Sequence, residues 1–322
     1  MHGRYLLTMK EIFLGTLVKK RRHELNISQE ELCLGICEPI TISRLENGQQ
    51  FPRRYVLTAI MDRLDLPSDR YYAIFNKEDE DFSILQFEID SLLNEAKAQT
   101  NASSYELVSK IHKKIEKLKD DFSNNDTLIL QFIKIKELEL LKLENQISLD
   151  VQLDLSLKAL QLTVHKIDLN QIHKSLLSLF EINIISDIAN IYAQKTFHDK
   201  ALILYQQLLD YSQSHFKNLK QSGTEITSIA YSYGQELLIT KHYKKAIDIT
   251  EFGIQVCINY AHYHFLSSLI QIQAESWFYL GDNVKSRALF YQAYYIYKAI
   301  DNPKELMQVK KIFYKYFHTE MI

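Results

Sequence analysis

The sequence predicts an all-α fold on three observations. Only 8 glycines and 4 prolines occur in 322 residues, whereas a β-sandwich or barrel needs turn residues roughly every 8–12 positions. Leu, Ile, Lys, Glu and Gln are abundant, and this composition favours helices. The chain is 46% hydrophobic and 24% charged, which supplies enough apolar surface to exclude global disorder. Its length suits two domains, or one domain followed by a repeat array.

The charge distribution and the cysteine content limit the cellular compartments and the partners that can be expected. Residues 1–76 carry 11 Lys and Arg against 9 Asp and Glu, and residues 77–322 carry 27 against 31. Cys33, Cys37 and Cys257 form no even disulfide framework, which favours a reducing compartment. Neither a signal peptide nor a charge-free apolar stretch long enough to span a membrane is present. We therefore expect a cytoplasmic, soluble protein without membrane contact.

The first 75 residues contain the signals of five short helices. Ser28 and Glu31 form a capping box that starts the second helix. Pro39 suits the first turn of a third helix, which Asn47-Gly48 should end. A fourth helix is expected after Pro52 and a fifth over Asp69–Phe75. Two helices joined by a tight turn inside such a bundle predict a helix-turn-helix DNA reader.

The residues of this segment resemble a known family in register. Residues 28–32 (SQEEL), residues 42–48 (ISRLENG) and Pro52 are similar to the repressor-type helix-turn-helix of the XRE family. The turn is one residue shorter than the commonest version. The resemblance implies a five-helix DNA-binding domain over residues 1–76 and a double-stranded DNA operator as partner.

The expected contacts to DNA fall into two groups. A third helix in the major groove presents side chains to the base edges. The expected base-reading residues are Ile40, Thr41, Ser43 and Arg44. Arg44 is best suited to a bidentate contact with guanine. The resemblance implies phosphate contacts from four further residues: Gln29, Asn47, Arg53 and Arg54. The alternative for Arg44 is an ion pair with Glu46 or Glu30. The basic cluster over residues 19–22 is either a solvent-exposed helix face or a flanking surface that contacts DNA backbone phosphates.

No pattern in the sequence indicates catalysis, a cofactor or a metal. Cys33 and Cys37 could form a redox or metal pair, but small core positions are the favoured interpretation. His262 and His264 favour an exposed helix start over metal ligands. Gly-rich phosphate loops are absent from the sequence. We expect no enzyme activity and no cofactor.

The remainder of the chain predicts a repeat array over residues 77–322. The charged run at residues 76–81 is interpreted as the break between the domains. Four similar segments follow, with alanines at regular spacing: Ala159, Ala201, Ala246 and Ala288. They are typical of tetratricopeptide repeats, stretched beyond the usual period. We expect five helix pairs, beginning with helices at 82–98 and 103–119 and capped by a helix at 303–318, in a right-handed superhelix with a concave inner face.

A helix-turn-helix followed by five long repeat pairs resembles the peptide-pheromone-responsive regulators of the RNPP family, the PlcR-like proteins. The resemblance implies quorum sensing: a short signalling peptide binds the concave face, and the repeat domain forms a homodimer. Two asparagines that clamp the peptide backbone in that family align with Ser186 and Ser232. The expected peptide-facing residues are Ser186, Tyr231, Ser232, Gln235, Ser268, Gln271, Glu275 and Phe278. Tyr231 and Phe278 have packing between repeats as an alternative.

Three functions fit this organisation. The first is a sequence-specific transcriptional regulator controlled by a peptide. The second is a DNA-binding repressor whose repeat domain only dimerises or docks a protein partner. The third is a repeat protein acting on another enzyme, which the intact recognition motif disfavours.

Overall fold

The computed structural model describes residues 14–67, 77–98, 104–122, 126–145, 147–216 and 219–321. Every regular element within these ranges is a helix, which confirms the all-α prediction. The fifth helix expected over Asp69–Phe75 lies outside the described residues. The chain divides into two compact units, Met1–Ile191 and Tyr192–Ile322. This division follows from how the backbone packs within each unit. The boundary between the DNA-binding and repeat domains at residues 76/77 stays a prediction.

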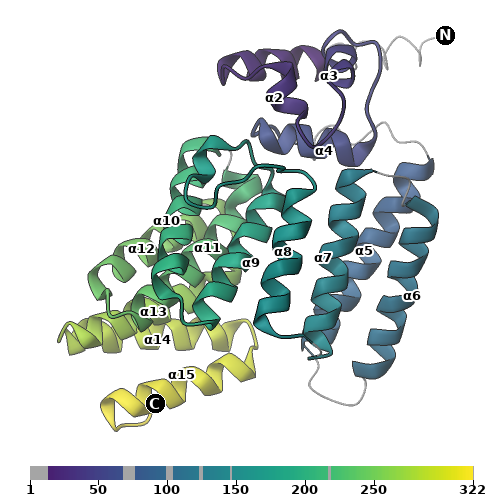
Figure 1. The fold of residues 1–322 in the computed structure, drawn as a ribbon. Helices are drawn as coiled ribbons and strands as arrows, with labels where there is room; N and C mark the ends of the chain where they lie inside the picture. The colour runs from purple at the N-terminus through teal and green to yellow at the C-terminus, as the bar shows by residue number, and fades with distance from the viewer. Residues whose placement is uncertain are drawn as a thin grey trace. The chain divides into compact units, whose positions relative to one another are not determined.

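The start of the first unit is a small helical bundle (Figure 1). A helix at 14–24 precedes α2 (Gln29–Cys33), α3 (Pro39–Glu46) and α4 (Arg54–Arg63). The capping box at α2 is confirmed, because Ser28 Oγ accepts from the Glu31 amide at 3.0 Å and Glu31 Oε2 accepts from the Ser28 amide at 2.7 Å. Pro39 occupies the first turn of α3, as expected. The bundle closes over buried residues that include Leu14, Val18, Leu32, Ile42, Leu45, Ile60 and Leu64.

The rest of the first unit consists of longer helices: α5 (Lys77–Ala98), α6 (Ser104–Phe122), α7 (Thr127–Leu143), α8 (Leu149–Gln161) and α9 (Leu179–Gln194). The charged run at residues 76–81, expected as a break, instead supplies the first turn of α5 from Lys77 onward. Acidic side chains are favourable at the positive end of a helix. Asp79 also has a packing role there, because it is buried and its Oδ1 accepts from the Arg54 amide at 3.2 Å.

The second unit continues with α10 (His198–His215), α11 (Leu219–Ile239), α12 (Tyr243–Tyr260), α13 (Leu266–Tyr279), α14 (Asn283–Ala299) and α15 (Pro303–Phe317). Helix α11 packs on α12 and α13 packs on α14, as expected for repeat pairs, and α15 follows at the end of the array. Its apolar face packs on α14, with Val309 and Phe313 fully buried.

The repeat register differs from the one expected from the alanines. Ala201 and Ala246 are fully buried, each four residues after the N-cap of its helix. The equivalent residue of α14 is the buried Ser286, whereas Ala288 is exposed. Ala159 is buried but lies near the end of α8. The expected spacing therefore holds only between Ala201 and Ala246.

A common turn geometry sets this register. The residue before each N-cap is left-handed, with φ of 60° at Thr196, 64° at Lys241 and 89° at Gly281. In each turn the N-cap amide then donates to the carbonyl five residues earlier, which closes the end of the preceding helix. The backbone of these three turns is thus equivalent although their sequences differ.

Candidate functional site

Helix α3 presents the predicted base-reading residues on its outer surface. Ile40 is 54% exposed, Arg44 is exposed, and Thr41 and Ser43 are half-buried. The opposite face of α3 is anchored in the bundle, because Ile42 is fully buried. The short helix is therefore held by its apolar face and turned with its polar face outward, as a recognition helix requires.

Arg44 makes neither of the ion pairs considered as its alternative. Its Nη1 donates to Gln50 Oε1 at 3.1 Å, in an exposed hydrogen bond. The bond joins a charged guanidinium to a neutral amide oxygen, and water competes for both groups at this exposed position. The guanidinium of Arg44 can consequently exchange Gln50 for the edge of a base at little cost.

Glu46 is held by Arg22 from the first helix. The pair is bidentate, with Nε to Oε1 at 2.6 Å and Nη2 to Oε2 at 3.0 Å, and both side chains are buried. The hydrogen bond to Glu46 and its charge raise the pKa of Arg22. The basic cluster at 19–22 is therefore divided, since Arg22 belongs to the bundle while Lys19 and Lys20 are exposed.

Gln29 is tied to the same carboxylate at the start of α2. Its Nε2 donates to Glu46 Oε2 at 2.8 Å, and the side chain is half-buried. This bond fixes the orientation of Gln29 relative to α3, which carries Glu46 in its last turn. Among the other predicted phosphate ligands, Asn47 and Arg53 are exposed.

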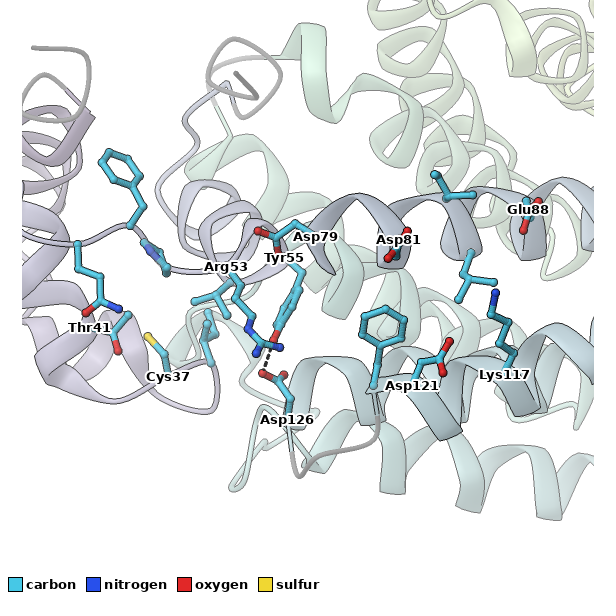
Figure 2. Close-up of a pocket in the computed structure, with 18 of the residues that line it drawn as sticks. Cys37, Thr41, Arg53, Tyr55, Asp79, Asp81, Glu88, Lys117, Asp121 and Asp126 are labelled. Atoms are coloured by element: carbon cyan, nitrogen blue, oxygen red, sulfur yellow. Dashed lines mark hydrogen bonds between the residues drawn. The ribbon is translucent and has the colours of Figure 1, made fainter. Parts of the chain in front are cut away.

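The adjacent arginines at positions 53 and 54 face different surroundings. The Arg54 guanidinium donates from Nη1 to Ser83 Oγ on α5 at 3.1 Å, so it links α4 to α5 inside the protein. The Arg53 side chain lies beside Tyr55 and Asp126 (Figure 2). Tyr55 donates to Asp126 Oδ2 at 2.7 Å, and burial together with this bond raises the pKa of Tyr55.

A cavity of about 1340 Å³ lies next to these residues, between the turn after α3 and helices α5 and α6 (Figure 2). Thr41 and Arg53 stand at its wall. Its charged lining residues are mainly acidic: Asp79, Asp81, Glu88, Asp121 and Asp126 against Arg53, Lys114 and Lys117. An acidic wall repels a phosphate backbone. The cavity therefore borders the α3 surface without extending the basic part of it.

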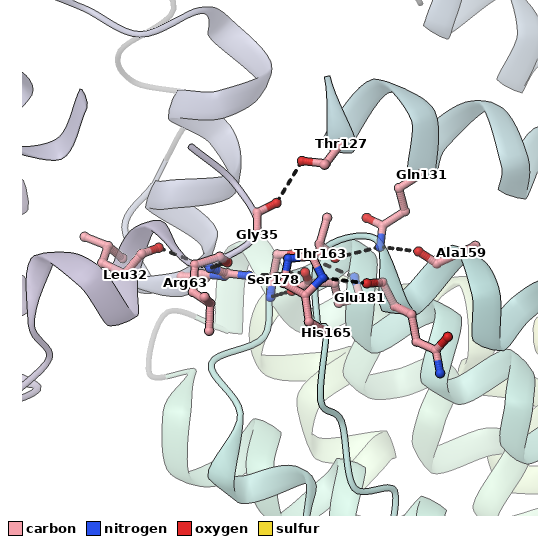
Figure 3. Close-up of polar contacts among 12 residues, drawn as sticks. Leu32, Gly35, Arg63, Thr127, Gln131, Ala159, Thr163, His165, Ser178 and Glu181 are labelled. Carbon is pink, nitrogen blue, oxygen red and sulfur yellow. Dashed lines mark hydrogen bonds and ion pairs between the residues drawn. The ribbon is translucent and has the colours of Figure 1, made fainter. Parts of the chain in front are cut away.

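The bundle is fastened to α9 by a buried ion pair that the sequence analysis missed (Figure 3). Arg63 and Glu181 are 2% and 1% exposed, with Nη2 to Oε1 at 3.3 Å. Arg63 Nη1 also donates to the carbonyls of Leu32 at 3.1 Å and Leu34 at 2.7 Å, at the end of α2. Glu181 Oε2 accepts from the Ser178 amide at 2.7 Å. One guanidinium thus joins the end of α2 to the first turn of α9.

A second fastening lies at the turn between α2 and α3. The Gly35 carbonyl accepts from Thr127 Oγ1 at 3.0 Å, at the start of α7. Gln131, one turn further on α7, donates to the Ala159 carbonyl at 3.0 Å and to Thr163 Oγ1 at 2.7 Å (Figure 3). Gly35 has φ of 73° and lies so close to the Thr163 carbonyl that no side chain fits between them.

The predicted peptide-facing residues are distributed over both units. Ser186 lies on α9 in the first unit and is buried. The other seven lie in the second unit: Tyr231, Ser232 and Gln235 on α11, and Ser268, Gln271, Glu275 and Phe278 on α13. Helices α11 and α13 contact each other, so these seven share one region of the second unit.

Polar side chains on α11 and on α13 form two separate hydrogen-bonded groups, which we name together the α11–α13 network. Gln235 Nε2 donates to the Tyr231 hydroxyl at 2.6 Å, and Gln271 Nε2 donates to Glu275 Oε1 at 3.1 Å. Glu275 Oε2 also accepts from the Tyr316 hydroxyl of α15 at 2.8 Å. Burial raises the pKa of Glu275. The network holds amide and carboxyl groups of the kind that bond an extended peptide backbone.

The two aromatic members of the set pack against neighbouring rings, the alternative considered above. The Phe278 ring centroid is 4.5 Å from that of Tyr316 and 5.3 Å from that of Phe317. The Tyr231 ring stacks on Phe265 at 5.2 Å. Both rings therefore contribute to the packing of the second unit.

The remaining candidates show no chemistry of a reactive site. Burial raises the pKa of the Cys37 thiol to about 12 and also raises that of Cys33, so both thiols stay protonated and inert at neutral pH. Within the described residues, no group of three or more His, Cys, Asp and Glu could hold a metal ion. Among the described helices, none combines the length and the apolar character that a membrane span requires.

Comparison with known proteins gives matches only among solved structures. No family model matches the sequence, and no curated protein matches it. Bacillus thuringiensis PlcR in complex with the peptide PapR7 and DNA is similar with a TM-score of 0.57 at 18% identity, over 93% of this chain and 99% of that chain. A Listeria monocytogenes EGD-e protein assigned as a transcriptional regulator has a TM-score of 0.51 at 15% identity, over 95% of this chain and 97% of that chain. This chain therefore shares the fold of PlcR, a helix-turn-helix bundle followed by tetratricopeptide-like repeats.

Proposed function

We propose that the protein is a sequence-specific DNA-binding transcriptional regulator, controlled by a short signalling peptide that binds its repeat domain. The observation that carries the proposal is the presentation of α3. Its apolar face is buried, its polar face with Arg44 points outward, and the Arg22–Glu46 pair fixes its last turn. PlcR, which shares the fold, has been solved with both a peptide and DNA, and this supports the same pair of partners here.

The DNA-reading step follows from the placement of α3. Two copies of the chain in a homodimer would place two α3 helices in successive major grooves, about one helical turn apart. Arg44, Ile40, Thr41 and Ser43 then face base edges, while Gln29, Asn47 and Arg53 face phosphates. We leave Arg54 out of this set, because its guanidinium already binds Ser83.

The peptide-binding step is assigned to the polar side chains on α11 and α13, with Ser232 in place of one of the family's asparagines. A hydroxyl reaches less far than an amide and cannot bond both backbone groups of a residue at once. Gln235 and Gln271 are therefore proposed as the main backbone ligands. Peptide binding shifts DNA affinity only if the peptide binds one arrangement of the DNA-binding domains better than another.

The proposal is tested by fluorescence anisotropy with DNA from upstream of the protein's own gene. The titration is repeated with synthetic peptides encoded by neighbouring small reading frames. We expect one peptide to change the affinity or the preferred half-site spacing, and Gln271→Ala to remove that response. Tight DNA binding that is indifferent to every peptide would instead support the second candidate, a repressor whose repeats dimerise or dock a protein.

Arg44→Ala is expected to weaken binding to the specific operator by roughly 5- to 150-fold, since a bidentate contact to guanine is worth about 1–3 kcal/mol. Binding to unrelated DNA should change much less. Arg44→Lys is the matched control: it keeps the charge and loses the planar fork, so it should lose most of the discrimination. Retention of sequence preference by Arg44→Ala would contradict the placement of α3 in the groove.

Arg53→Ala is expected to weaken binding to all DNA sequences alike and to reduce the slope of log K against log salt by about 1. Neighbouring Arg54→Ala is the matched control, because it removes the same charge from a side chain that binds Ser83. Its salt slope should equal that of the unmodified protein. Equal slope changes in both variants would show that the two arginines act as a general positive field.

A further inference from the structure

The equivalent turns of the second unit form one edge, which we name the turn edge and define as residues 192–200, 237–245 and 277–285. These segments join α9 to α10, α11 to α12, and α13 to α14. The ring of Tyr243 stacks on that of Tyr279 at 4.8 Å and 9°, which places the second and third turns side by side. His198 hydrogen-bonds to Glu236, which ties the first turn to the end of α11. The three turns are therefore contiguous.

A lysine occupies the same position in every turn. Lys200, Lys245 and Lys285 each lie three residues after the N-cap, and all three are exposed. Each ammonium lies over an aromatic ring, most closely at Lys285, whose Nζ is 3.8 Å from the Trp277 centroid. A cation held over a ring is positioned by it and keeps its outer side open to a partner.

Charge on the turn edge is predominantly positive. The three segments contain six lysines and two aspartates: Lys195, Lys200, Lys241, Lys244, Lys245 and Lys285, with Asp199 and Asp282. The N-termini of α10 and α12 lie in the same edge and have no side-chain cap. Their helix dipoles add to the positive potential. The edge therefore attracts negative charge.

Large apolar side chains are exposed between these lysines. Val284 is 82% exposed and Ile239 is 63% exposed. Phe197, Tyr279 and Leu280 from the same three turns are exposed as well. Single exposed apolar residues are ordinary, but several in one contiguous region mark an interaction surface.

We propose that the turn edge binds an acidic segment of a partner protein that also carries apolar side chains. Carboxylates of the partner pair with the lysine row, and its apolar side chains cover Ile239 and Val284. The exposed aliphatic side chains of these two residues favour a protein over nucleic acid, because a phosphate backbone has no apolar group to cover them. The lysines of this surface belong neither to α3 nor to the polar side chains assigned to the peptide, so the proposal does not depend on the function proposed above.

The test uses the full chain and a fluorescein-labelled synthetic peptide of glutamates interspersed with leucine and phenylalanine. The same peptide with glutamine in place of glutamate tests the charge requirement. The variant carries Lys200→Glu, Lys245→Glu and Lys285→Glu together. Its matched control reverses three exposed lysines outside the edge: Lys298→Glu, Lys304→Glu and Lys311→Glu. Circular dichroism verifies that both variants are folded.

We expect the acidic peptide to bind the unmodified protein and the control alike, and to bind the edge variant at least about tenfold more weakly, with an affinity that falls as salt is raised. The glutamine peptide should bind weakly to all three. Val284→Asp, at a side chain that is almost fully exposed, should also weaken the acidic peptide without affecting folding.

Four results would overturn the proposal. They are absence of binding by the acidic peptide, equal loss in the control variant, equal binding of the glutamine peptide, and an unchanged affinity in Val284→Asp. Two further results would reassign the surface. Binding of oligothymidine that is lost in the edge variant would make it a nucleic-acid surface. A lower molar mass of the edge variant in light scattering would make it a contact with a second copy of the chain.

Discussion

Replacing Gly35 with alanine is expected to lower the free energy of unfolding by about 2–5 kcal/mol. The φ of 73° is a left-handed conformation that costs an L-residue about 1–2 kcal/mol. A Cβ at this position would also meet the Thr163 carbonyl oxygen, which is a backbone atom that cannot rotate away. Overpacking of this kind costs about 1–3 kcal/mol or more. Urea unfolding followed by far-UV circular dichroism measures the loss, and hydrogen exchange of α2 and α3 locates it.

Gly281→Ala separates the two contributions. Gly281 has φ of 89°, but nothing lies within 4 Å of the position that a Cβ would take. Only the backbone strain applies there, so we expect a loss of about 1–2 kcal/mol. Equal losses in the two variants would contradict the close approach of Gly35 to Thr163.

Arg63→Ala is expected to destabilise the protein by about 3–5 kcal/mol, because it leaves the carboxylate of Glu181 buried without its counter-charge. It also removes the donor to the carbonyls of Leu32 and Leu34. We expect the same unfolding experiment to show the loss, and faster hydrogen exchange at the end of α2 and the start of α9.

Two comparisons make this result specific. Lys158→Ala breaks the exposed pair with Asp154, whose side chains are 63% and 57% exposed, and should cost less than about 1 kcal/mol. The double variant Arg63→Met, Glu181→Gln removes both charges, and it should lose less than the sum of the single losses. A loss in Arg63→Ala as small as that in Lys158→Ala would contradict a structural role for the buried pair.

Local signals in the sequence were sufficient for the helix-turn-helix bundle. The capping box at Ser28, Pro39 in the first turn of α3, and Gly48 after it all act within a few residues, so they predict the start of α2 and both ends of α3. Packing partners far apart in the chain have no such signal. Arg63 and Glu181 are 118 positions apart, and neither residue indicates from sequence that the other is its partner.

The repeat register could not be taken from alanines alone. Serine and alanine are both small enough for the tight contact between paired helices, so Ser286 replaces the alanine while Ala288 faces solvent. The feature that fixes the register is a left-handed residue before each N-cap. Threonine and lysine rarely adopt that conformation, so the residue types at Thr196 and Lys241 do not predict it.

For the candidate sites, the sequence predicts which types of residue lie at the surface better than it predicts which residues they bond to. Arg44 is exposed on α3 as expected, but its partner is Gln50, a residue in the loop beyond the motif. Arg54 belongs to the same basic pair as Arg53 in the sequence, yet it faces α5 because α4 begins at that residue and turns its side chain inward. A one-residue step along a helix rotates the side chain by about 100°, which no charge pattern reveals.

The position of Lys285 has an optical consequence. Trp277 is the only tryptophan of the chain, and the Lys285 ammonium lies 3.8 Å from its ring centroid. Indole emission is sensitive to a charge held at that distance, so any partner that draws Lys285 away changes the fluorescence without a label. The protein therefore carries a built-in reporter at the very edge where we propose that a partner binds.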